Sequence, residues 1–163
     1  MTILLKNKDK LCINGFFFKC SIGKRGLTQN KIEGDKKTPK GTFSLGPLFY
    51  RGDRNKKPKT KLKTIKIKPN MGWCDDTNSK KYNRLIKTNK TIKHEKMYRK
   101  DHKYDFLIPI SYNFKKPKKN KGSAIFIHLT KNYNKTLGCI CINKKDFMIL
   151  IKIINKNTKI KIN

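Results

Sequence analysis

The sequence is divided into short apolar runs by frequent turn-forming residues, a pattern that favours β-strands over helices. Runs at 2–6, 10–13 and 16–20 are each too short for a stable helix, and Asn14–Gly15 between the last two is typical of a two-residue hairpin turn. The segment 61–68 places Leu and Ile between lysines, as a half-exposed strand does. Further strands are predicted at 42–45, 104–112 and 123–129.

Helical spacing is clearest near the C-terminus. Asn143 is a suitable N-cap with Asp146 three residues on, and apolar residues then recur every three or four positions, at Phe147, Leu150, Ile151 and Ile154. A short helix is also expected at 79–87, and 158–162 alternates as a closing strand. The pattern predicts a mainly β fold of the α+β class, with one main helix.

Length and charge limit the class of protein. The 163 residues show no linker or repeat, so we expect residues 1–163 to form one domain. No apolar run approaches the 18 or more residues of a membrane span, and no secretory signal is recognisable.

The net charge is +32, and 37 of the 42 basic residues are lysine. Two interpretations stay open: the codon bias of an AT-rich genome, or a polyanion-binding surface.

The five cysteines are an odd number and form no CxxC pair, which favours reduced thiols. Cys139 and Cys141 lie two residues apart, so both point to the same side of a strand. A zinc site built from these two thiols and His128 lacks the usual ligand spacing, so no metal or cofactor is expected.

One stretch carries the elements of thiol chemistry. His128 follows a nearly all-apolar run, and Thr136-Leu137-Gly138-Cys139 begins eight residues later, just before the predicted helix. A cysteine nucleophile needs a base such as imidazole to form its thiolate. Gly138 would open the backbone so that N–H groups reach a developing oxyanion, and Thr136 would orient the imidazole. Cys141 lies between two isoleucines and is interpreted as packing.

These residues resemble the active-site motif of the YkuD family of L,D-transpeptidases, in which a His is followed by Ser or Thr, any residue, Gly and Cys. The block Thr38-Pro39-Lys40-Gly41-Thr42-Phe43 is similar to a second motif of that family. Short matches to a compact, signal-less subgroup complete the resemblance over about residues 20–150: Gly72 to Asp76, Tyr82 to Arg84, His94-Glu95, Tyr104-Asp105 and Gly122 to His128. This chain departs at two places, with Leu129 in place of a common Gly and Cys141 in place of a common Arg or His.

The resemblance implies a curved β-sandwich and acyl transfer on peptidoglycan stem peptides. Cys139 would form a thioester and release the terminal D-Ala, with His128 as general base and acid and the Gly138–Cys139 backbone as oxyanion site. An amine acceptor makes the protein a transpeptidase. Water makes it an L,D-carboxypeptidase of peptidoglycan recycling. A non-catalytic polyanion-binding module is the alternative from another class.

The remaining expectations concern substrate and setting. The resemblance implies substrate contacts from Trp73, Asp76, His94 and Tyr104, while helix capping by Asp75 or Asp76 and a local ion pair at His94-Glu95 are the structural alternatives. The partner would be a peptidoglycan stem peptide or soluble muropeptide bound by a bacterial monomer, with no specific nucleic acid. Without a signal sequence we expect a cytoplasmic protein, or a periplasmic one if the true start lies upstream.

Overall fold

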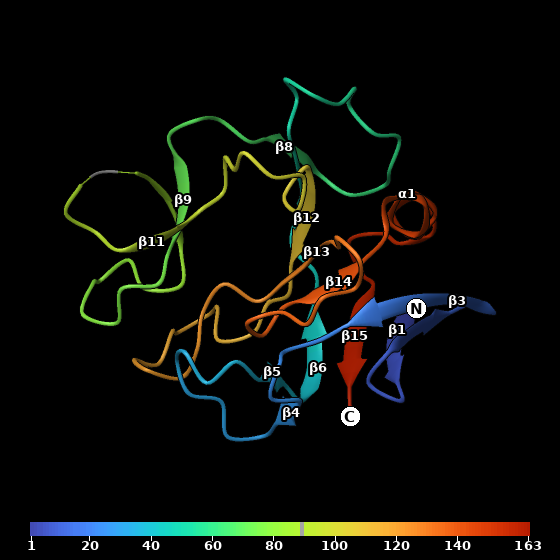
Figure 1. Ribbon diagram of the computed structural model, residues 1–163, viewed down its shortest axis with the longest axis horizontal. Coiled ribbons are helices and arrows are strands. Elements are labelled where there is room, and N and C mark those ends of the chain that lie inside the picture. The colour runs from blue at the N-terminus through green and yellow to red at the C-terminus, as the bar shows by residue number, and fades with distance from the viewer. Residues whose placement is uncertain (89) are drawn as a thin grey trace.

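The computed structural model describes residues 1–88 and 90–163 and is built around a curled ten-stranded sheet (Figure 1). The sheet has the order β6-β15-β1-β2-β3-β14-β13-β12-β7-β8. Its strands are β1 (Thr2–Lys6), β2 (Lys10–Ile13), β3 (Phe16–Ser21), β6 (Gly41–Ser44), β7 (Leu48–Tyr50), β8 (Thr64–Lys66), β12 (Phe106–Pro109), β13 (Phe126–Leu129), β14 (Ile140–Ile142) and β15 (Lys159–Ile162). The predicted mainly β class is confirmed.

The two ends of the chain meet inside this sheet. β15 pairs parallel to β1, with Ile3 opposite Ile160, and antiparallel to β6. The Asn14–Gly15 hairpin is confirmed, because both residues have the positive φ angles, 46° and 79°, that a tight two-residue turn requires. β13 and β14 form a second parallel pair, which is the pair that positions the candidate site.

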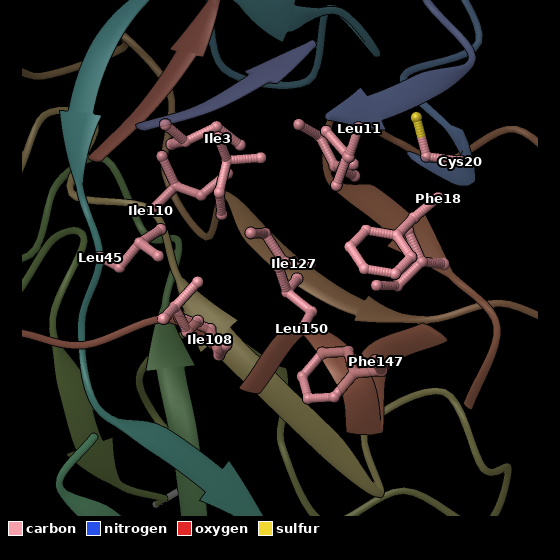
Figure 2. Close-up of a cluster of buried hydrophobic side chains, with 14 of the residues drawn as sticks. Ile3, Leu11, Phe18, Cys20, Leu45, Ile108, Ile110, Ile127, Phe147 and Leu150 are labelled. Carbon is pink, nitrogen blue, oxygen red and sulfur yellow. The ribbon is translucent and has the colours of Figure 1, made fainter. Parts of the chain in front are cut away.

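The helix α1 (Lys144–Ile153) is the one α-helix of the described residues and covers the main core. Asn143 caps it as predicted, since its side-chain oxygen accepts a 2.8 Å hydrogen bond from the Asp146 N–H. Phe147 and Leu150 are fully buried against apolar side chains from both halves of the sheet, including Ile127 (Figure 2). At ten residues α1 is short, and no helix in the described ranges is long and apolar enough to cross a membrane.

A second cluster of buried side chains lies on the other face of β12 and β13. Its members include Phe49, Trp73, Met97, Leu107 and Phe126. It is covered by a small sheet of β9 (Met71–Cys74), β10 (Leu85–Lys87) and β11 (His94–Lys96), which lies beside the main sheet in Figure 1. A two-stranded ladder of β4 (Leu27–Thr28) and β5 (Thr38–Pro39) lies between β3 and β6 in the sequence.

The short helix predicted at 79–87 is wrong. The segment contains turns up to Asn83, which has a φ of 55°, and then strand β10. β10 pairs antiparallel to β9 with Leu85 opposite Trp73. The apolar spacing at Tyr82, Leu85 and Ile86 was therefore produced by a turn followed by a strand. Three-residue strands such as β7, β10 and β11 are too short to leave a periodic signal.

Candidate active site

His128 and Cys139 are brought together by the parallel pairing of β13 and β14. His128 lies opposite Cys141, and Ile127 lies opposite Ile140. Side chains alternate along a strand, so Ile127 and Ile140 enter the main core while His128, Cys139 and Cys141 share the opposite face. Two apolar strands thus carry the imidazole and both thiols to one side of the sheet.

On that side a cavity of about 710 Å³ is lined by His128, Cys139 and Cys141. Tyr104 and the segment from Ser123 to Ile125 form further parts of its wall. Cys139 is partly exposed, whereas the other four cysteines are buried. Cys139 is therefore the thiol that a molecule in the cavity can reach.

The imidazole of His128 is held in one orientation. Its Nδ1 lies 2.8 Å from the carbonyl oxygen of Leu129, and a carbonyl only accepts, so Nδ1 carries the proton and Nε2 is left with the free lone pair. The Tyr104 ring packs edge-on against the imidazole with ring centroids 5.2 Å apart. Burial lowers the pKa of His128 to about 4, so the imidazole is neutral at physiological pH.

The thiol of Cys139 lies between two backbone groups of the neighbouring segment. It donates to the Ala124 carbonyl at 3.2 Å and accepts from the Phe126 N–H at 3.4 Å. Burial raises the pKa of Cys139 to about 12. The site therefore holds both the thiol of Cys139 and the imidazole of His128 in their neutral forms at physiological pH.

The turn before Cys139 depends on Gly138. Its φ of 141° is accessible to glycine, and a Cβ on it would lie 2.9 Å from the Lys37 carbonyl oxygen. The expectation that Thr136 orients His128 is wrong. The Thr136 hydroxyl donates to the Cys139 carbonyl at 2.6 Å and accepts from the Gly138 N–H at 3.1 Å, so Thr136 shapes the turn instead.

The cavity is strongly cationic. Eight basic side chains line it, from Lys24, Lys31, Lys36, Lys93, Arg99, Lys103, Lys131 and Lys135, against three acidic ones, from Glu33, Asp75 and Glu95. Some cations are neutralised nearby: Lys31 pairs with Asp35, and Arg99 pairs with Glu95 and Asp101. The surplus of positive charge suits a ligand with several carboxylates.

Three of the four predicted substrate contacts do not reach the cavity. Trp73 is buried in the second cluster and donates from Nε1 to Asn83 Oδ1 at 2.8 Å. The Asp76 carboxylate accepts from the Asn78 N–H at 2.9 Å within a turn, and the helix that it was expected to cap is replaced by turns and β10. His94 Nδ1 bonds to the Ile92 carbonyl at 2.7 Å. Tyr104 lines the cavity as expected.

In two neighbouring pairs the residue predicted from the sequence is the wrong member. Asp75 lines the cavity instead of Asp76, and Glu95 lines it instead of His94. His94 and Glu95 lie on β11, where successive side chains point to opposite faces. An ion pair with a nearby lysine was expected there, and Glu95 instead pairs with Arg99 at 3.0 Å. The register of β11 on β9 decided the outcome, and the sequence alone did not supply that register.

Comparison with known proteins gives a consistent result. A family model for YkuD, the L,D-transpeptidase catalytic domain, matches residues 3–162. No curated protein matches the chain. Among solved structures, the crystal structure of the helical cell shape determining protein Pgp2 from Campylobacter jejuni is similar, with a TM-score of 0.49 and 18% identity over 99% of this chain and 46% of that one. The chain therefore spans less than half of that protein's length. Because the family model covers nearly all of the sequence, the chain belongs to the YkuD family of L,D-transpeptidase catalytic domains.

Proposed function

We propose that the protein is a cysteine-dependent acyl transferase that acts on peptidoglycan stem peptides, with Cys139 as nucleophile. The observation that carries the proposal is that His128 on β13 and Cys139, the residue just before the adjacent strand β14, line one cavity, with the Nε2 lone pair of His128 able to accept a proton. Family membership supplies the reaction class and the substrate class.

In the proposed reaction, Cys139 Sγ attacks the carbonyl carbon of the bond between the diamino acid and the terminal D-Ala. The thiol proton passes to Nε2 of His128 as the S–C bond forms. The C–N bond then breaks, Nε2 returns the proton to the departing amine of D-Ala, and a thioester remains on Cys139. An amine or water finally attacks the thioester, giving a crosslink or a free carboxylate.

The protonation states of the two side chains fit this order of events. With its pKa at about 4, the imidazole is neutral and can accept a proton at any higher pH, and a neutral thiol has one to give. The Leu129 carbonyl stabilises the imidazolium that forms, since it accepts from Nδ1. Because the Gly138 N–H is engaged by Thr136, we assign the oxyanion to the Cys139 N–H.

The charge of the cavity supports a stem peptide as the substrate. Such a peptide carries a terminal carboxylate and further carboxylates along its length, and the lysines at the cavity wall would attract them. Lys103 is well placed for this, because its positive charge acts on both His128 and Cys141.

The test is incubation with a disaccharide tetrapeptide followed by mass spectrometry. Loss of D-Ala alone identifies an L,D-carboxypeptidase, and a crosslinked dimer identifies a transpeptidase. The Cys139→Ala variant should give neither product. If the wild-type protein leaves the tetrapeptide intact and forms no acyl-enzyme, the proposal is wrong and the polyanion-binding module becomes the better account.

A further inference from the structure

We infer that the exposed face of β1, β2 and β3 is a second anion-binding surface, which holds the carboxylate-bearing remainder of a polymeric peptidoglycan substrate while one stem occupies the catalytic cavity. The inference rests on the proposed function and extends it from a free peptide to a polymer.

The surface is defined by a row of three lysines. Lys6 on β1 lies directly opposite Lys10 on β2, and Lys10 lies opposite Lys19 on β3. All three side chains are exposed, because Leu5, Leu11 and Phe18 take the core side of the same strands. Like charges directly opposite one another destabilise a sheet, so repulsion between these lysines lowers the stability of the fold. A bound anion would offset that loss. None of the residues of these three strands is acidic.

The row lies on the catalytic face of the sheet. Ser21 on β3 pairs with Cys141, which in turn pairs with His128, so these three side chains share one face. Lys19 precedes Ser21 by two residues and points the same way, about 7 Å further along the strand. The Lys19 ammonium lies over the ring of Tyr133 at 4.8 Å, in the loop that borders the catalytic cavity.

A second cavity shares one lining residue with the catalytic cavity. It measures about 350 Å³, and its wall includes Ser21 and the turn Asn7–Asp9 that joins β1 to β2. Lys135 lines both this cavity and the catalytic one. Lys8 adds a further positive charge, against the single carboxylate of Asp9. The lysines of the row do not line this second cavity, but Lys6 and Lys10 flank its turn Asn7–Asp9 in the sequence, and Lys19 lies next to its residue Cys20.

The dimensions favour a polymer over a small peptide. Adjacent strands are about 4.8 Å apart, so Lys6 and Lys19 span about 10 Å beyond the second cavity. A polymer offers carboxylates to the row in addition to those of the one stem in the catalytic cavity. Exposed lysines bind such groups through salt-sensitive attraction and need no bidentate geometry.

The experiment measures sedimentation of the protein with isolated insoluble peptidoglycan, in the Cys139→Ala background so that no turnover occurs. Changing Lys6, Lys10 and Lys19 together to Gln should weaken binding by about tenfold at low salt. The matched control changes Lys56, Lys57 and Lys59 to Gln, which removes the same charge from exposed positions in the loop between β7 and β8. The control should bind within about twofold of the parent.

Two further readouts separate this inference from misfolding and from the proposed function. The row variant should melt at the same or a higher temperature, because a repulsion is relieved. With Cys139 intact, the row variant should process the disaccharide tetrapeptide at the parent rate.

If the parent has no activity but the row variant alone loses peptidoglycan binding, the inference of a binding surface stands and the proposed reaction fails. Equal loss of peptidoglycan binding in both triple variants would show that the effect comes from net charge alone. If the row variant kept normal peptidoglycan binding but lost binding to duplex DNA, the lysine row would be assigned to nucleic acid. Either result overturns the inference.

Discussion

The Thr38 hydroxyl donates a 2.8 Å hydrogen bond to the Gly138 carbonyl and accepts one of 2.9 Å from the Gly23 N–H. Thr38 is fully buried, so water cannot replace either bond if the hydroxyl is removed. The two segments that carry the family resemblance, 100 residues apart, are therefore joined by one side chain at the turn that presents Cys139. Thr38 holds the turn that carries Cys139, the proposed nucleophile, without lining the cavity.

The first prediction concerns this bond. Thr38→Val keeps the shape of the side chain but leaves the Gly138 carbonyl and the Gly23 N–H unsatisfied. It should lower the free energy of unfolding by about 1–3 kcal/mol and slow acylation of Cys139 by a carbapenem. Urea titration and intact-protein mass spectrometry measure the two effects. Thr38→Ser retains the hydroxyl and should recover most of the acylation rate; equal losses in both variants would contradict the assigned role.

A second prediction separates backbone strain from steric conflict at Gly138. Gly138→Ala must accommodate both an unfavourable φ and a Cβ 2.9 Å from the Lys37 carbonyl oxygen. It should abolish acylation. Gly26 has a positive φ of 80°, but a Cβ added there would meet no atom within 4 Å. Gly26→Ala should therefore lose about 1 kcal/mol of stability and keep its activity. Comparable activity in the two alanine variants would show that the turn tolerates a side chain.

The third prediction is a loss of stability in acid that depends on His128. The unfolded chain binds a proton at this histidine near its ordinary pKa of 6.5, whereas burial in the folded protein lowers the pKa to about 4. Between these values the unfolded state holds more protons, so stability falls as the pH drops from about 7 to 4, by a few kcal/mol (~3). Thermal unfolding across this range measures it. His128→Asn should lose most of this dependence, and the exposed His102→Asn should keep it.

Local signals were enough for the elements that depend on nearby residues. The Asn14–Gly15 turn and the Asn143 cap are each set by interactions within four residues, and both were predicted correctly. The apolar run predicted at 123–129 likewise contains strand β13 with His128, and Cys139 lies just before the neighbouring strand β14. At these positions burial and turn formation require particular residue types, so the sequence alone indicates the structure.

The errors have other causes. Trp73 was assigned to substrate because it lies in a motif, but pairing of β9 with β10 buries it beside Asn83. Thr136 was assigned to His128, but the hydroxyl found nearer partners in its own turn. The burial of Trp73 depends on strand register and on contacts between segments, which no local pattern encodes, whereas the Thr136 bonds belong to an irregular turn whose shape the motif did not reveal.

The last prediction compares the two thiols that line the cavity. Cys139→Ala should abolish thioester formation, because the covalent route has no other partly exposed thiol among the five cysteines. Cys141 is buried, with its Sγ 3.8 Å from the Asn134 carbonyl, so Cys141→Ala should cost about 1 kcal/mol of stability and keep most of the activity.

Alkylation gives an independent measure of the same assignment. With a pKa of about 12, the thiolate fraction of Cys139 rises about tenfold per pH unit, so labelling by iodoacetamide should be slow at pH 7 and accelerate to pH 10. Peptide mapping should locate the label on Cys139 ahead of Cys141, because Cys139 alone is partly exposed. A carbapenem, which presents a carbonyl, should acylate Cys139 at neutral pH, since His128 removes the proton during attack. Full activity in Cys139→Ala with loss in Cys141→Ala would move the nucleophile by two residues, and the proposed chemistry of this cavity would then have to be rebuilt around Cys141.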